Sequence, residues 1–238
     1  MRPEYGETWA YESIIGALPG VDLAEGTAIA IQLVVFEVAV LVLAWYYDLW
    51  NAAIAGTAAV VVAAVGSIEM LRISRIARAP ETPEPYRRLL FSSSIEVVLA
   101  VLAFVALITH LFVFDPRTGE PLIEVLFGTE APILVVYLML LVLWDLCYRI
   151  GTGWWAAVVA LWRSGRYRFE PATAATLRQA DRETLLFGVV QLVLVPFLLD
   201  HPVLLVALLG HVVAVTVVTS ASLALLRLRE LSTETASA

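Results

Sequence analysis

The chain has 238 residues, of which 61% are hydrophobic and 16% charged, and its net charge is −7. Soluble domains are about half apolar and about a quarter charged, so this composition argues against a water-soluble protein. The acidic balance also argues against a broad basic surface for nucleic acid. Together with a mean hydropathy of +0.85, these values predict an integral membrane protein with no nucleic-acid partner.

Missing residue types exclude several kinds of site. All 15 cationic residues are arginines, which excludes a Schiff base to retinal or pyridoxal phosphate and a P-loop lysine. The single cysteine, Cys147, excludes an intrachain disulfide, a cysteine-based zinc site and a four-cysteine iron–sulfur cluster. HExxH and GxSxG motifs are absent, and the three histidines lack ligand spacing on one helix. We therefore expect neither an enzyme nor a metal site.

Six apolar stretches in chain order predict six membrane-spanning helices, because about 20 helical residues cross the hydrocarbon layer. The predicted spans cover residues 27–47, 51–68, 89–114, 132–162, 184–199 and 203–226. The expected fold is an all-α membrane bundle with both termini in the cytoplasm. Residues 1–26 form a cytoplasmic or interfacial segment, residues 27–226 the six-helix transmembrane domain, and residues 227–238 a cytoplasmic tail.

The fourth stretch is too long for one crossing and leaves two alternatives. Four aromatic residues recur along it at spacings of 4, 7 and 7: Trp144, Tyr148, Trp155 and Trp162. This period places them on one edge of a continuous helix. Gly151 and Gly153 would instead allow a bend that lays residues 153–162 along the inner interface. Those ten residues are too few for a seventh crossing.

Prolines place shorter elements between the spans. The second helix is expected to continue through Arg78 until Pro80 ends it. Pro171 opens a helix-compatible run that leads into the fifth span, and residues 121–128 predict an interfacial turn of helix. The connections are therefore expected to be ordered.

The arginines predict which ends of the spans lie in the cytoplasm. With both termini inside, 14 of the 15 arginines lie on the cytoplasmic side and only Arg117 lies outside, as the positive-inside rule requires for short loops. Arg72, Arg75 and Arg78 are spaced by three and are candidates for contact with anionic lipid headgroups. A purely topological role is the alternative. The sequence thus predicts a multi-pass protein of the cell membrane.

Polar side chains inside the predicted spans are the candidate functional residues. They are Glu37, Glu96, Asp145, Arg149, Gln191, His110 and His211. A charge at mid-span costs about 2.5–3.5 kcal/mol on insertion scales, so each one requires a partner, water or a function. Asp145 and Arg149 are four residues apart and predict an ion pair. We also expect the polar stripes of the third and sixth spans to face each other. These groups would then form a ladder across the membrane that starts at Glu69.

Three functions are compatible with this pattern. The first is translocation of protons or small cations along the buried carboxylates. The second is a non-catalytic membrane component that binds lipid, a partner membrane subunit or a second copy of itself. The third is an electron carrier with a haem between His110 and His211. No other cofactor is expected.

Two segments carry a family resemblance, GETWAYESIIGALPG at residues 6–20 and DLCYRIGTGWW at residues 145–155. With the acidic, lysine-free composition, they resemble an uncharacterised family of multi-pass membrane proteins from halophilic archaea. The resemblance covers most of the chain. It implies a membrane location and no particular activity.

Overall fold

The computed structural model describes residues 9, 25–117 and 119–237, and within them the chain is helical with no strand. The elements follow in the order α2 (Glu25–Tyr47), α3 (Trp50–Ala77), α4 (Glu84–Phe91), α5 (Ile95–Thr109), η1 (His110–Phe114), η2 (Asp115–Arg117), α6 (Leu122–Phe127), α7 (Ile133–Arg166), α8 (Pro171–Val190), η3 (Gln191–Phe197) and α9 (Pro202–Ser237). The prediction of an all-helical fold is confirmed for this part of the chain.

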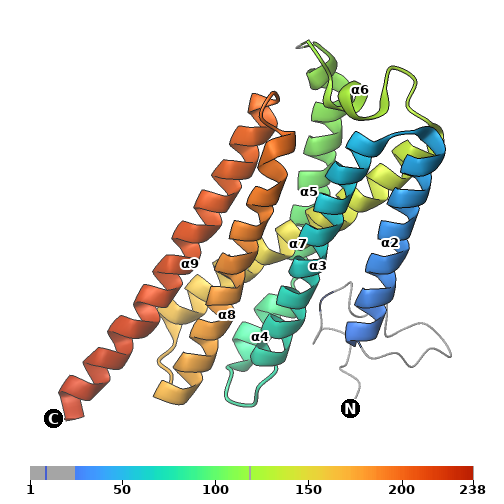
Figure 1. Cartoon of the computed structure of the whole chain (residues 1–238). Helices are drawn as coiled ribbons and strands as arrows, with labels where there is room; N and C mark the ends of the chain where they lie inside the picture. Colours follow the sequence, from blue (N-terminus) through green and yellow to red (C-terminus); the bar gives the residue numbers. More distant parts are fainter. Residues whose placement is uncertain (1–8, 10–24, 118, 238) are drawn as a thin grey trace.

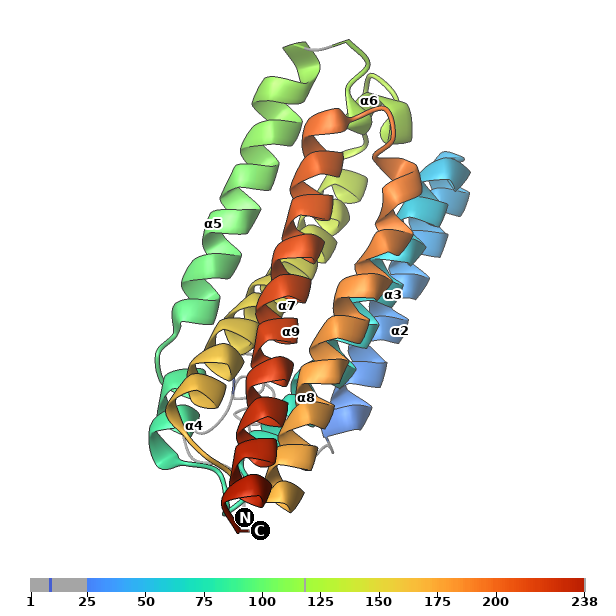
Figure 2. The same ribbon diagram turned by 90° about the vertical axis from the view of Figure 1, so that its left-hand side faces the viewer.

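The long helices lie side by side and run alternately up and down (Figure 1). The end where α2 begins and α9 ends also carries α4, and it is called here the arginine-rich end. The opposite end carries α6 and is called the acidic end. Figure 2 shows α5 at one edge of the bundle and α2 with α3 at the other. The main packing partners of α7 are α5, α9 and α3, so α7 is the helix that connects these three within the bundle.

Among the described residues, five helical segments are long and apolar enough to cross a membrane: Gly26–Tyr47, Trp50–Ala77, Glu84–Arg117, Ile133–Arg166 and Pro202–Glu230. The predicted span at residues 184–199 corresponds to the second half of α8 together with η3. It is not among the five because α8 carries four charged residues: Arg178, Asp181, Arg182 and Glu183. The sixth crossing and the cytoplasmic position of both termini therefore stay predictions.

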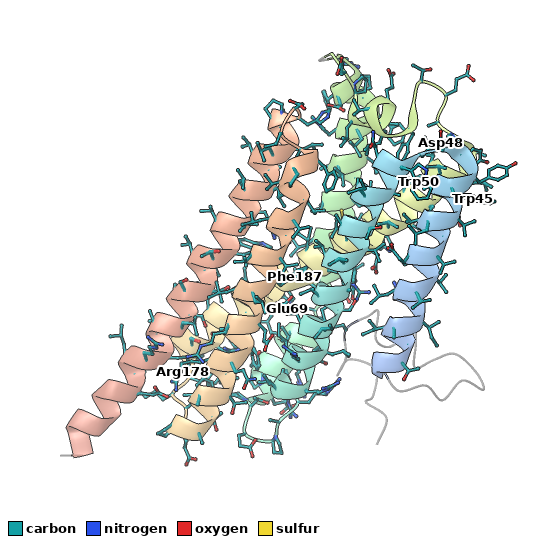
Figure 3. All side chains as sticks on the ribbon, viewed as in Figure 1. Trp45, Asp48, Trp50, Glu69, Arg178 and Phe187 are labelled. Carbon is teal, nitrogen blue, oxygen red and sulfur yellow. The ribbon has the colours of Figure 1, made fainter. Side chains whose placement is uncertain are left out.

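Apolar and aromatic side chains face outward, as contact with lipid requires. Val34, Leu102 and Val206 are each at least 60% exposed, which water would penalise and hydrocarbon would not. Trp45 and Trp50 are exposed at the acidic end, on either side of the turn at Asp48 (Figure 3). Exposed tryptophans at helix ends are typical of the membrane interface.

The third predicted span, residues 89–114, lies within the candidate span Glu84–Arg117, but it is not one continuous helix. α4 ends at Phe91, and a break at residues 92–94 precedes α5. Ser94 has a positive φ of 52°, and the Ser93 hydroxyl accepts a hydrogen bond from the amide of Ile95. Serine side chains compete with helical backbone bonds in this way. The other expected connections are confirmed: α3 ends at Ala77, α8 begins at Pro171, and α6 occupies residues 122–127.

Of the two alternatives for residues 132–162, the bend at Gly151 and Gly153 is wrong, because α7 is one continuous helix. Gly151 serves packing instead: a Cβ atom there would lie 2.9 Å from the backbone nitrogen of Ala100 on α5. At Gly66 on α3, a Cβ atom would lie 2.9 Å from the Cβ of Arg149 on α7. The two glycines therefore allow α3 and α5 to approach α7 closely.

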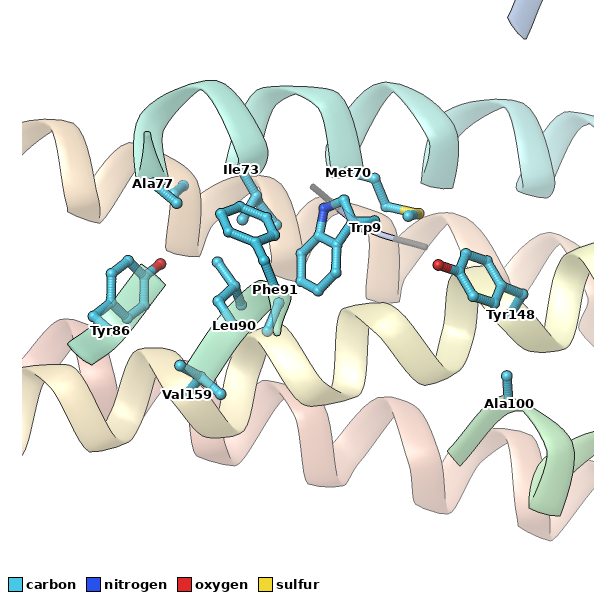
Figure 4. Close-up of a cluster of buried hydrophobic side chains, with 12 residues drawn as sticks. Trp9, Met70, Ile73, Ala77, Tyr86, Leu90, Phe91, Ala100, Tyr148 and Val159 are labelled. Carbon is cyan, nitrogen blue, oxygen red and sulfur yellow. The ribbon is translucent and has the colours of Figure 1, made fainter. Parts of the chain in front are cut away.

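A cluster of buried apolar residues fills the bundle toward the arginine-rich end (Figure 4). Trp9 belongs to it, is fully buried, and packs edge-on against Phe91 with ring centroids 4.9 Å apart. Met70 and Leu90 line the same cluster. The rest of the predicted N-terminal segment, residues 1–8 and 10–24, lies outside the described residues.

The expected contact between the third and sixth spans is wrong. α5 packs mainly on α7, and α9 packs on α7 and α8. α5 and α9 are not among the principal contacting pairs. Ala100, a small residue of α5, lies against Gly151 of α7.

Gly151→Ala is expected to destabilise the fold by about 1–3 kcal/mol, because the added methyl group meets the backbone of α5 and cannot displace it cheaply. Thermal unfolding in detergent measures the change. Gly165→Ala is the matched control on the same helix, since a Cβ atom at Gly165 has no neighbour within 4 Å. Equal stability of the two variants would contradict the close approach of α5 and α7.

Candidate functional site

Arg163 of α7 lies at the centre of a buried polar network near the arginine-rich end. Its side chain is 1% exposed, and that of Asp181 on α8 is 2% exposed. Arg163 Nη2 donates to Asp181 Oδ1 at 2.5 Å and to the carbonyl oxygen of Leu177 at 3.2 Å. Arg163 Nη1 donates to the hydroxyl of Tyr86 on α4 at 3.0 Å. The Ser222 hydroxyl on α9 donates to Asp181 Oδ2 at 2.7 Å.

This network joins four helices, α4, α7, α8 and α9. Ser164 extends it, with its Oγ 2.8 Å from that of Ser222. Burying a guanidinium and a carboxylate is costly unless both are paired and hydrogen-bonded, and here the remaining lone pairs and protons are largely satisfied. We interpret the network as structural. The sequence does not predict this network, because Arg163 and Asp181 lie just outside the predicted spans at residues 132–162 and 184–199.

The ion pair predicted between Asp145 and Arg149 is present, with Arg149 Nη2 at 2.9 Å from Asp145 Oδ1. Both side chains are buried in α7. Arg149 Nη1 also lies 3.5 Å from the sulfur of Met70 on α3. The pair therefore neutralises itself on one helix, as i, i+4 spacing allows.

Glu69 of α3 is a buried carboxyl group. Its side chain lies beside Phe187 (Figure 3) and faces Gly153 of α7. Thr184 of α8 is the nearest hydrogen-bonding side chain, but neither carboxyl oxygen has a well-formed hydrogen bond to a described residue. An unsatisfied buried carboxyl group is costly, so Glu69 is a candidate for a function.

Three further sequence candidates lie apart from one another. Glu96 is buried in the first turn of α5, and its Oε2 has no hydrogen bond to the described residues. Gln191 is buried where η3 begins. Glu37 is half-buried on α2 and accepts a hydrogen bond of 2.8 Å from Thr57 of α3. The hydrogen-bonding partner of Glu37 therefore comes from the neighbouring helix α3.

The histidines have different partners. His201 and Asp115 are buried together at the acidic end, with His201 Nδ1 3.1 Å from Asp115 Oδ1. His110 Nε2 lies 3.9 Å from the same oxygen. His211 packs against Trp154 of α7, with ring centroids 6.2 Å apart. The structure therefore brings His110 near His201 through their shared partner Asp115.

An apolar cavity of about 310 Å³ lies between the helices toward the acidic end. Its lining comes from α2, α3, α5, α6, α7, η3 and α9, and it includes Ala53, Leu111, Leu138 and Leu204. The lining side chains are all hydrophobic apart from Gly56. Alanine and glycine on α3 leave the space that larger side chains would fill.

A second, polar pocket of about 610 Å³ opens beside the apolar cavity. Its charged and polar lining residues are Asn51, His110, Asp115, Glu120, Asp200 and His201. Leu122, Leu126 and Phe197 line both spaces. The two pockets therefore adjoin at the acidic end. Within the described part of the chain, no group of three or more acidic, histidine or cysteine side chains has the geometry of a metal site.

The predicted polar ladder is interrupted. Glu69 lies beside Gly153 of α7, whereas His110 lies in the polar pocket at the acidic end. The apolar cavity extends along α7 as far as Leu146 and Ile150, and no polar side chain lines it.

The three arginines proposed to meet lipid headgroups are not equivalent. Arg72 pairs with Glu183 of α8, with Arg72 Nη1 2.6 Å from Glu183 Oε2. Arg75 is exposed, and Arg78 is half-buried at the end of α3. Headgroup contact stays a prediction, and Arg75 is the residue best placed for it.

Removing one member of the Arg163–Asp181 pair is expected to destabilise the protein strongly. Asp181→Leu leaves a buried guanidinium without its anion and should cost about 3–5 kcal/mol. The double variant Arg163→Met with Asp181→Leu should lose less than the single variant. Glu84→Leu, which breaks an exposed pair with Arg88, should cost about 1 kcal/mol or less. Thermal unfolding in detergent measures the stability of all three variants. A double variant that is less stable than Asp181→Leu would contradict the structural interpretation of the network.

Comparison with known proteins identifies a family and no function. No curated protein matches the chain, and no solved structure matches it. One family model, described as a family of unknown function (DUF7530), matches residues 4–222. The halophilic archaeal origin stays a prediction, but the expected membership of an uncharacterised family is confirmed. The match covers most of the chain, and the protein belongs to this family of unknown function, DUF7530.

Proposed function

We propose that this protein is a non-catalytic membrane component that binds a lipid-like molecule in the apolar cavity near the acidic end. The observation that carries the proposal is the cavity itself, about 310 Å³ in volume and lined by hydrophobic side chains from several helices. Small-molecule sites are typically concave, mostly apolar and about 300–1,000 Å³ in volume. The cavity lies among helices that are long and apolar enough to span a membrane.

An apolar occupant suits this cavity better than water does. A water molecule in a cavity needs two to four polar partners, and cavities without them stay dry. The lining offers no such side chain. A hydrocarbon chain would instead recover the van der Waals contacts that the surrounding side chains lack.

A second candidate, translocation of protons or small cations, is supported by Glu69 and Glu96. Both are buried, each has a carboxyl oxygen without a hydrogen bond, and neither forms an ion pair with another described residue. Buried carboxyl groups of this kind occur along proton and cation paths. The apolar cavity argues against the candidate, since none of its lining side chains could carry a proton or cation.

Binding of radiolabelled dodecanol to the purified protein in a nonionic detergent tests the lipid-binding proposal. The wild-type protein should bind one saturable equivalent, and a free concentration of about 100 Kd should stabilise the fold by about 2.7 kcal/mol. Ala53→Leu should reduce both effects because Ala53 lines the cavity. Ala224→Leu is the control, because Ala224 is exposed and outside the cavity lining. Equal binding by all three proteins would contradict the proposal.

Proton flux into proteoliposomes under a pH gradient tests the second candidate. If Glu69 carries protons, Glu69→Gln should abolish the flux, while Glu81→Gln should preserve it because Glu81 is an exposed acid. Absence of flux in the wild-type protein, or equal flux in Glu69→Gln, would eliminate this candidate. Lipid binding would be unaffected by either result.

A further inference from the structure

The polar pocket at the acidic end adjoins the cavity assigned to the apolar chain and shares part of its wall. Leu122 and Leu126 of α6 and Phe197 of η3 line both spaces. A molecule with its chain in the cavity would therefore place its polar end among the residues of the pocket. What those residues accept or repel determines which head group fits.

His201 presents a hydrogen-bond acceptor to this pocket. Its Nδ1 faces the carboxylate of Asp115, which can only accept, so Nδ1 carries the proton. The second oxygen of Asp115 accepts a hydrogen bond of 2.6 Å from the amide of Leu122, which fixes the carboxylate. In the neutral imidazole, Nε2 then carries the lone pair. His201 lines the pocket, its side chain is 94% buried, and Nε2 has no hydrogen bond to a described residue.

The charges around the pocket have one sign. Asp115 lies on its wall, and Glu120 and Asp200 are exposed at its rim. Arg117 is the single arginine of this end among the described residues, and its guanidinium lies over the ring of Phe114 at 5.8 Å from the centroid. Arg117 does not line the pocket. The pocket therefore attracts a cation and repels an anionic phosphate or carboxylate.

We infer, on the basis of the proposed function, that this pocket selects the head group of the bound molecule and that the preferred ligand is a cationic amphiphile with an ammonium head. The ammonium N–H donates to His201 Nε2, and its charge is balanced by Glu120 and Asp200. The alkyl chain extends past Leu122 and Phe197 into the apolar cavity. An anionic lipid of equal chain length is disfavoured because it meets the same carboxylates.

Three amphiphiles with the same chain separate head-group selection from chain binding. Radiolabelled dodecylammonium, dodecanol and dodecanoate are titrated against the purified full-length protein in nonionic detergent at neutral pH, with protein-free micelles as the blank. We expect dodecylammonium to bind about tenfold more tightly than dodecanol, and dodecanoate to bind most weakly. Equal affinities for the three would overturn the inference and leave the proposed function intact. Absence of saturable binding by all three would overturn both.

Paired charge variants then localise the selection. Glu120→Gln combined with Asp200→Asn should bring the affinity for dodecylammonium down to that for dodecanol, while the affinity for dodecanol stays unchanged. Glu124→Gln combined with Glu130→Gln removes the same charge from exposed positions at the same end that do not line the pocket. This control should keep the tenfold preference. An equal loss in both double variants would assign the preference to general surface charge and overturn the inference.

Discussion

The structure depends on one constraint: polar groups between apolar helices must find their partners within the protein. Hydrocarbon offers them no hydrogen bonds, and an unpaired polar group there costs several kcal/mol. The chain meets this constraint mainly through α7. Arg163 binds groups on α4 and α8, and Asp145 and Arg149 neutralise each other on α7 itself. Gly151 allows α5 to pack against the same helix. α7 therefore sets the positions of its neighbours.

The two halves of the bundle differ as a result. Toward the arginine-rich end, side chains such as Tyr86, Leu90 and Trp9 fill the space between helices. Toward the acidic end, α8 gives way to the tighter η3 helix, which contains Pro196. Proline lacks an amide hydrogen and interrupts the α-helical pattern, so this segment does not continue the packing of α8. Leu194 and Phe197 of η3 line the apolar cavity. The cavity thus lies where regular helix packing ends.

Features that depend on one helix were predictable from the sequence, and features that depend on two were not. Hydropathy located the long helices, and i, i+4 spacing identified the Asp145–Arg149 pair. Gly151 was ambiguous, because a glycine permits both a bend and a close approach, and only the position of Ala100 on α5 decides between them. Arg163 and Asp181 are separated by a turn between two helices, so no periodicity within one helix relates them. The proposed ladder required α5 to face α9, which the sequence alone does not determine.

The apolar cavity bears on the choice between the proposed functions. A proton or cation that entered it would meet no side chain able to bind it. Transfer of a charge into such surroundings is far more costly than the contacts it could gain. A hydrocarbon chain has no such cost there, and its polar end can stay among Asp115, His201 and Asp200. The neighbouring apolar and polar surfaces therefore match the two ends of an amphiphile.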